Sequence, residues 1–317
     1  MVINKGFIME VNQLIGVICV ITSLLFFILE VFIYHTFYKK KFLLKNTAYK
    51  LILLLSILET AQQISQLAGG ISSIIEKKLP IVLERFLGAL LQTSFIVAIL
   101  TTLFLTLNRF YIFYKSIIYN YVNQRLITKI AIGILISFYI SLFVTYSFKD
   151  YGLQYNVDTC DWNYIMDADI PIPIYKFEYL FVLSTLLLCF CFYMLIFGRI
   201  LLQRITMPSN NNRKLLNSSD FRLLIHVIFI FVYSVFVEVL WWYLEDWFPD
   251  SNFTRAILNY AWLIYCGMNT TLNIIIIKEI REEFFELITC NKCKRNIEGT
   301  VTPCVSVKQV KEKVIIK

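Results

Sequence analysis

The sequence has little charge, little proline and glycine, and almost no histidine. Charged residues make up 16% of its 317 positions and hydrophobic residues 58%, whereas soluble domains carry roughly a quarter charged residues. This shortage of charge excludes an ordinary water-soluble domain. Six prolines and ten glycines leave no linker that would divide the chain, so we expect one compact unit without solenoid repeats.

Patterns for catalysis and metal binding are also missing. The two histidines, His35 and His226, are too few for a metal-binding histidine box, and no HExxH, GxSxG or P-loop pattern occurs. Cys290, Cys293 and Cys304 lack the fourth ligand that a structural zinc site needs. We therefore expect no enzymatic activity, no metal and no cofactor.

Long apolar runs dominate what is present. A bilayer core about 30 Å thick needs roughly 20 apolar residues per helix, and these runs are continuous rather than alternating, as they would be in a membrane barrel. The first run is too long for a cleavable signal and has no small-residue cleavage site after it. The sequence predicts an all-α polytopic bundle over 13–277, preceded by a tail at 1–12, with seven transmembrane helices at 13–37, 47–73, 84–114, 126–148, 172–201, 222–245 and 256–277.

Charge differs between alternate linkers. Those after the first, third and fifth runs are basic and contain one acid, Asp220, whereas those after the fourth and sixth runs are rich in Asp and Glu. Basic short loops stay in the cytoplasm, so we expect an extracellular N-terminus and a cytoplasmic C-terminus in the plasma membrane. The net charge of +8 then reflects topology, and nucleic acid is not an expected partner.

Two further features fit this orientation. Asn252 begins an Asn-Phe-Thr glycosylation sequon in an expected extracellular loop. Residues 278–290 alternate apolar and charged positions at helical spacing, which predicts an amphipathic helix on the cytoplasmic membrane face, followed by a cytoplasmic tail at 291–317. Cys290 and Cys293 are candidates for palmitoylation, with two ordinary reduced thiols as the alternative.

Ionisable residues inside apolar runs are costly and suggest function. Glu59 lies in a polar stripe, which predicts a polar network in the bundle core, and Glu238 is expected to line a cavity. For both, a simple hydrogen bond to a neighbouring helix is the alternative. Glu178 lies close to the extracellular end of its run, where snorkelling to the interface is the simplest interpretation.

The third run closes with Asn108-Arg109-Phe110. An acidic-Arg-aromatic triplet closes helix 3 in rhodopsin-like G-protein-coupled receptors, and this chain resembles that family. The Leu-Asn-Arg-Phe form resembles the nematode serpentine chemoreceptors. Asn273 resembles the start of the family's N-P-x-x-Y stretch, and Glu59 stands where the family has a helix 2 aspartate.

The chain departs from the family at several motifs. The proline and tyrosine of the helix 7 stretch are Ile274 and Ile277, and the helix 6 proline is absent. The family's helix 3 cysteine, which is bonded to the second extracellular loop, corresponds to Glu84. Cys160 in that loop therefore lacks its usual partner.

The resemblance implies a chemosensory receptor, located in sensory cilia in the chemoreceptor branch, that binds a small-molecule ligand and activates a heterotrimeric G protein. Arg109 would be the switch contact, held by Asp220 unless Asp220 only caps its helix. For the aromatic candidates for ligand binding, the alternative is a role as anchors at the membrane interface. The candidates are Gln92, Tyr175, Tyr179, Glu238, Trp241, Trp242, Tyr260 and Tyr265.

Other classes remain as alternatives. A transporter or ligand-gated channel subunit would act without a G protein, although the interrupted helix pairs typical of transporters are absent. A membrane-embedded lipid enzyme would need a catalytic cluster, which the sequence does not contain. The ligand, the G-protein subtype and any homo- or hetero-oligomer are left open.

Overall fold

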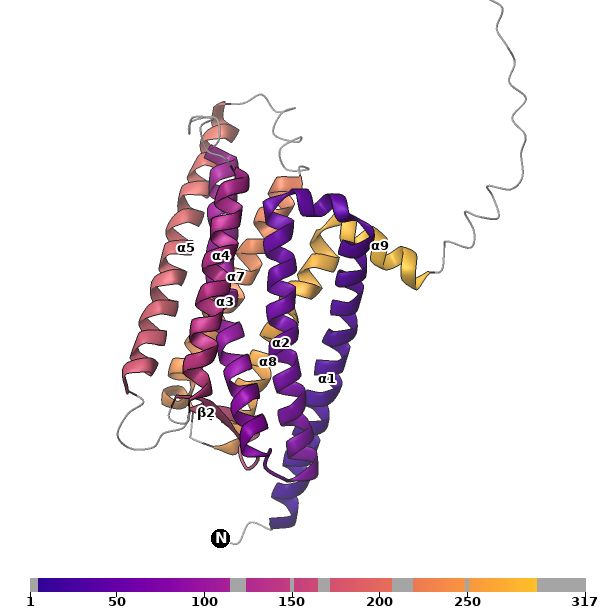
Figure 1. Cartoon of the computed structure of the whole chain (residues 1–317), viewed down its shortest axis with the longest axis vertical. Coiled ribbons are helices and arrows are strands. Elements are labelled where there is room, and N and C mark those ends of the chain that lie inside the picture. The colour runs from indigo at the N-terminus through magenta and orange to yellow at the C-terminus, as the bar shows by residue number, and fades with distance from the viewer. Residues whose placement is uncertain are drawn as a thin grey trace, which may run out of the picture.

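The computed structural model describes residues 5–114, 124–148, 151–164, 172–206, 219–248 and 251–289. Long helices run side by side along the bundle (Figure 1), which confirms the all-α fold class. They are α1 (Lys5–Lys39), α2 (Thr47–Ile75), α3 (Ile81–Tyr114), α4 (Gln124–Ser147), α5 (Ile172–Thr206), α7 (Ser219–Trp247) and α8 (Asn252–Ile276).

Helix bounds lie close to the predicted runs. The largest difference is at the N-terminus, where α1 begins at Lys5, so most of the expected tail at 1–12 is helical. Among the described residues, six helices are long and apolar enough to cross a membrane. The seventh, α8, meets that test together with the short helix α9 (Lys278–Ile288), and the two meet at 90°.

Local capping explains where several helices begin and end. The side chain of Asn46 accepts a hydrogen bond from the backbone N–H of Ala48 and caps α2, after the 3-10 turn η1 (Lys41–Lys45). Ser251 caps α8 in the same way through Thr254 N–H, at 3.2 Å. Such caps satisfy amide groups that have no partner inside the helix.

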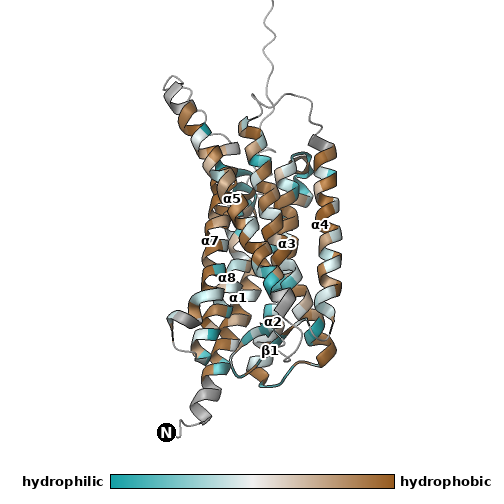
Figure 2. Ribbon diagram, turned by 90° about the vertical axis from the view of Figure 1, so that its left-hand side faces the viewer, coloured by the Kyte–Doolittle hydropathy of each residue, from teal (hydrophilic) through white to brown (hydrophobic). Residues whose placement is uncertain are grey.

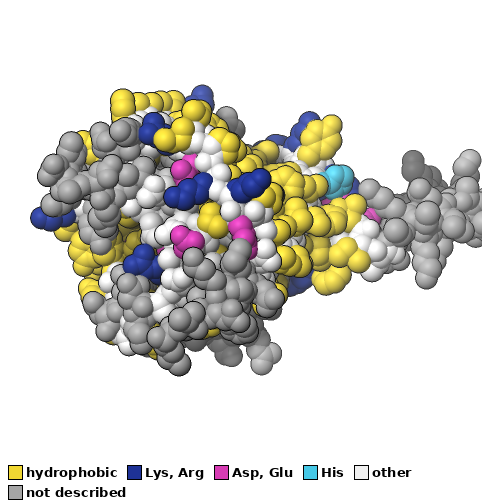
Figure 3. All heavy atoms as spheres, turned by 90° about the horizontal axis from the view of Figure 1, so that it is seen from below, with side chains coloured by type: hydrophobic (Ala, Val, Ile, Leu, Met, Phe, Trp, Pro, Cys, Tyr) yellow, Lys and Arg dark blue, Asp and Glu magenta, His cyan; other side chains and the backbone are white. Residues whose placement is uncertain are grey.

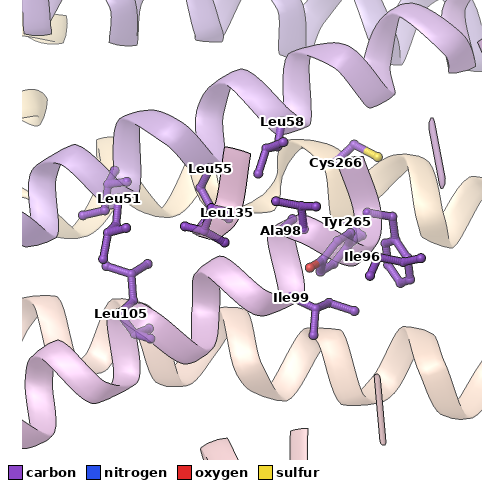
Figure 4. Packing of buried hydrophobic residues seen from close by; sticks show 14 of the residues in the cluster. Leu51, Leu55, Leu58, Ile96, Ala98, Ile99, Leu105, Leu135, Tyr265 and Cys266 are labelled. Atoms are coloured by element: carbon purple, nitrogen blue, oxygen red, sulfur yellow. The ribbon is translucent and has the colours of Figure 1, made fainter. Parts of the chain in front are cut away.

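The interior lies between α2, α3 and α8. Figure 4 shows Leu51, Leu55 and Leu58 of α2 pointing towards Leu105 and Ala98 of α3. Figure 2 shows that α4 and α7 are mostly hydrophobic along their length, as lipid-facing helices would be. Apolar packing is therefore continuous across the bundle, and the polar groups described below are buried within it.

A β-hairpin covers one end of the bundle, here called the hairpin end. Strands β1 (Leu153–Asn156) and β2 (Asp161–Tyr164) pair antiparallel, a hairpin that the apolar runs did not predict. Figure 3 views this end, where Lys, Arg, Asp and Glu side chains gather near the centre among hydrophobic ones. Trp162 of β2 is fully buried against the helices.

Glu84 and Gly88 fasten the hairpin to α3. Glu84 Oε1 accepts a hydrogen bond from the backbone N–H of Tyr155 at 3.0 Å. A Cβ at Gly88 would lie 2.2 Å from the carbonyl oxygen of Leu153, so this close approach requires glycine. A hydrogen bond and a backbone contact thus hold the loop where the resemblance would place a disulfide.

Helix α9 lies across the opposite end, here called the α9 end. Its Glu283 forms ion pairs with Lys39 and Lys40 at the end of α1, the latter at 3.6 Å. Phe284 packs edge-on against Phe32 of α1, with ring centroids 5.4 Å apart. The predicted amphipathic helix is therefore present and is fixed to the first helix.

Candidate functional site

A small cavity opens among α3, α5, α7 and α8 in the half of the bundle nearest the hairpin. Its volume of about 10 Å³ is close to the least that holds one water molecule. It is lined by Gln92, Phe95, Glu178, Val237, Glu238, Trp241 and Trp262. Two carboxyl groups and several aromatic rings therefore share one enclosed space.

Glu178 does not snorkel, so that interpretation was wrong. Its side chain is buried, and it accepts hydrogen bonds from Gln92 Nε2, from Tyr146 at 3.0 Å and from Tyr164 at 2.5 Å. A carboxylate held by three donors gains more from the protein interior than from reaching the interface. Glu178 thereby joins α3, α4, α5 and β2.

Tyr164 connects the hairpin to this cavity. Burial raises the pKa of its hydroxyl well above the usual range, and the charge of Glu178 raises it further. The hydroxyl therefore stays protonated and donates to Glu178. A movement of the hairpin would in this way act directly on a carboxyl group that lines the cavity.

An aromatic wall closes the other side of the cavity. Trp262 lies edge-on to Phe95 and to Trp241, with centroids 5.3 and 5.1 Å apart. Its indole N–H donates to Gln62 Oε1 at 3.1 Å. The orientation of Trp262 is thus fixed by both packing and a buried hydrogen bond.

The predicted ligand-binding residues separate into groups. Gln92, Glu238 and Trp241 line the cavity. Trp242 borders it, donating from Nε1 to Glu238 at 3.0 Å and packing on Tyr179 at 4.6 Å. These residues are brought together as the sequence suggested.

The other predicted ligand-binding residues lie elsewhere. Tyr265 is buried behind Phe95, with centroids 5.6 Å apart. Tyr260 contacts Thr22 of α1 through its hydroxyl at 3.3 Å, so it faces a different helix pair and the interpretation as a cavity residue was wrong. The side chain of Tyr175 is outside the described part of the chain.

Several residues of this site were not predicted from the sequence. Phe95, Val237 and Trp262 line the cavity, and Tyr146 and Tyr164 hold Glu178. The apolar three had no signal, because they resemble any other residues of an apolar run. Glu178 was the available signal, since a carboxylate in a membrane run needs donors from neighbouring elements.

Larger hollows lie on the outside of the bundle, between α2, α3 and α4. They measure about 170 and 290 Å³ and are almost entirely apolar. Ile57, Ile127 and Ile136 in their walls are half exposed, so these hollows face the surface that lipid would cover. The interior cavity is the better candidate for recognition of a polar ligand.

Arg109 is completely buried near the α9 end of α3. Its Nη2 donates to Oδ1 of the adjacent Asn108 at 3.1 Å. Its neighbour Phe110 stacks on Tyr114 and lies edge-on to Phe192 of α5. Asp220 lies in the first turn of α7, but its side chain is outside the described part of the chain, so the proposed salt bridge stays a prediction.

A polar network runs through the middle of the bundle. Asn269 Nδ2 donates to Glu59 at 3.2 Å, and Thr270 of α8 donates to Glu30 of α1. Asn273, on the same helix, lies beside the buried His226 of α7. The network links the helices between the cavity and Arg109.

The structure describes the predicted glycosylation site but not the predicted palmitoylation sites. Asn252 is exposed at the start of α8, and its Nδ2 donates to the carbonyl of Asp158 at 3.0 Å. Cys290 and Cys293 are outside the described residues. Cys160 is a buried free thiol within the described part.

Comparison with known proteins identifies the fold of the chain. No protein-family model matches the sequence, and no curated protein matches it. Among solved structures, the crystal structure of squid rhodopsin is similar, with a TM-score of 0.69 over 97% of this chain and 90% of that chain. Sequence identity is 13%, so the likeness shows that this chain has the seven-helix fold of rhodopsin.

Proposed function

We propose that the chain is a chemosensory G-protein-coupled receptor of the plasma membrane. The observation that carries the proposal is a buried arginine, Arg109, at the α9 end of α3 within a rhodopsin fold. The proposal assigns the hairpin end to the extracellular side and the α9 end to the cytoplasm. The charge of the linkers supports this orientation.

The cavity of Gln92, Glu238 and Trp241 is the proposed ligand site. A ligand can activate the receptor only if it binds the active state better than the resting one. The polar network of Glu59, Asn269 and His226 lies between this site and Arg109. We propose that rearrangement of this network accompanies release of Arg109 towards the G protein.

The cytoplasmic surface is the proposed G-protein contact. Basic residues on this side would favour an acidic partner; they include Arg125, Lys129, Arg199, Arg204, Arg213 and Lys214. Asn252 is proposed as a glycosylation site, and Cys290 with Cys293 as palmitoylation sites. The bilayer is the remaining partner, and the oligomeric state is left open.

Replacing Arg109 with alanine tests this proposal in cells. Ligands are screened by cAMP and calcium readouts, and cell-surface levels are measured alongside. The proposal expects Arg109→Ala to lose G-protein activation while surface expression persists. Arg281→Ala is the control on the same side, since Arg281 is partly exposed and its Nη1 donates to the backbone oxygen of Ile275 in α8. Equal signalling by the native chain and both variants would contradict the proposal.

A further inference from the structure

Two glutamates from different helices face one cavity near the hairpin. Glu178 of α5 and Glu238 of α7 both line it, and the space between them has the volume of about one water molecule. Within the described part of the chain, neither carboxyl group forms an ion pair. Two buried carboxyl groups that share a site are costly to charge together, and a bound positive charge would offset that cost.

Gln92 adds a buried acceptor to this cavity. Its Nε2 is committed to Glu178, which fixes the orientation of the amide. Its Oε1 has no hydrogen-bond partner, although the side chain is only 2% exposed. A buried acceptor without a donor costs free energy, and here it lines the same space as the two carboxyl groups.

The remaining walls are apolar and aromatic. Phe95, Trp241 and Trp262 line the cavity together with Val237. Aromatic faces attract a cation because the ring carries negative charge on its face. The aromatic and apolar wall of the cavity therefore suits the apolar part of an organic cation.

We propose that this cavity binds the ammonium head of a small primary amine whose body is apolar. A primary ammonium carries one positive charge and three N–H donors, which match the free acceptor of Gln92 and the carboxylates of Glu178 and Glu238. Its head is about the size of a water molecule, whereas a trimethylammonium group is too large for the space. The inference rests on the proposed function, because it names the ligand class of the same site.

Amine binding would also act on the helices. An ammonium between Glu178 and Glu238 attracts α5 and α7 to one point. The present space of about 10 Å³ holds only this head, so the apolar body enters when the side chains of Trp241 and Trp262 move apart. A state in which both carboxylates reach the ammonium would be favoured over one in which they do not. This gives the amine the preference for one conformation that an agonist needs.

Binding of 3-methylbutylamine to the full chain in lipid nanodiscs tests the inference without a G protein. Affinity is measured from ligand-dependent thermal unfolding, with 3-methylbutan-1-ol as the neutral analogue, the N,N,N-trimethyl derivative as the bulky cation, and sodium chloride held constant. We expect the amine to bind at least about tenfold more tightly than either analogue. Equal stabilisation by amine and alcohol would overturn the inference, as would equal stabilisation by the trimethyl compound.

Two variants assign the effect to the cavity. Glu238→Gln keeps the shape and removes one charge, and we expect about a tenfold loss of amine affinity or more. Gln92→Met removes the free acceptor together with the Nε2 donor to Glu178, and we expect weaker amine binding. Glu282→Gln is the control, because Glu282 is exposed at the α9 end. Unchanged amine affinity in both cavity variants would overturn the inference.

Failure of the inference and failure of the proposed function give different results. Tight, Glu238-dependent amine binding without any G-protein activation would sustain the amine site and contradict the receptor proposal. Activation of a G protein by neutral ligands only, with no preference for the amine in nanodiscs, would sustain the receptor and contradict the amine site.

Discussion

Arg109 and Asn108 form a hydrogen bond between adjacent side chains, with Nη2 and Oδ1 3.1 Å apart. Receptors that the chain resembles have an acid beside this arginine, which makes an ion pair. An amide accepts a hydrogen bond but carries no charge, so it holds the guanidinium less tightly. Arg109 is therefore buried with a neutral neighbour where a charged one is expected.

The first prediction concerns basal activity, which is signalling without ligand. Asn108→Asp should lower basal G-protein signalling by about fivefold, since a charge-assisted hydrogen bond is stronger by about 1 kcal/mol. Asn108→Leu, which removes the acceptor, should raise it. Both are measured as nucleotide exchange without ligand, normalised to surface level. Unchanged basal signalling in both variants would mean that packing alone keeps the resting state.

Gly88 provides a test of how the hairpin is held. Gly88→Ala places a Cβ 2.2 Å from the backbone oxygen of Leu153, which should lower the free energy of unfolding by about 1–3 kcal/mol. The control is Gly133→Ala on α4, where a Cβ meets nothing within 4 Å and helix propensity predicts a slight gain. Thermal unfolding in nanodiscs compares the two, and equal shifts would contradict the close contact.

The attachment of α9 should depend on pH. Burial raises the pKa of Glu283, but the ion pairs with Lys39 and Lys40 outweigh it, and the pKa lies below its ordinary value of 4.5. The stabilisation is therefore complete above pH 4.5 and is lost as pH falls through the lower pKa of the folded state. Protection of the amides of residues 278–289 from hydrogen exchange, measured relative to the intrinsic exchange rate at each pH, should fall below that pH.

Two variants check the assignment to Glu283. Glu283→Gln should weaken the protection of α9 at neutral pH and remove most of its acid dependence. Glu282→Gln, which breaks an exposed pair with Lys278, should leave both unchanged. Identical acid profiles for the native chain and Glu283→Gln would contradict the assignment.

The central network predicts a cost for removing one donor. Asn269→Leu leaves Glu59 without the hydrogen bond at 3.2 Å, and an unsatisfied buried acceptor costs about 1–3 kcal/mol. Thr271→Val on the same helix is the control, because the hydroxyl of Thr271 donates to the backbone oxygen of Gly267 within its own helix. Thermal unfolding should show a larger loss for Asn269→Leu, and an equal loss would contradict the network.

The helices were predictable because each apolar run is read from composition alone, and membrane thickness sets its length. The hairpin at 153–156 and 161–164 was not, since two short strands in a polar loop have no such constraint. Contacts between distant elements were also beyond the sequence. Glu84 looked like a missing cysteine, whereas it holds Tyr155 by a hydrogen bond.

Candidate site residues were predictable only in part. Polar residues in apolar runs stand out, which is how Gln92 and Glu238 were selected, and both line the cavity. Aromatic residues do not stand out in such runs. Tyr260 and Trp262 are two positions apart on α8, yet Tyr260 contacts α1 whereas Trp262 lines the cavity. Glu178 was misread because its three donors come from α3, α4 and β2.

The central claim is that this chain activates a G protein, and reconstitution tests it most directly. The purified chain is placed in nanodiscs with purified heterotrimeric G proteins, and uptake of a non-hydrolysable GTP analogue is measured with and without Arg109→Ala. The account predicts uptake above the G protein alone, reduced to that background by Arg109→Ala. No stimulation of any G protein, together with flux or current through liposomes that contain the chain alone, would contradict it.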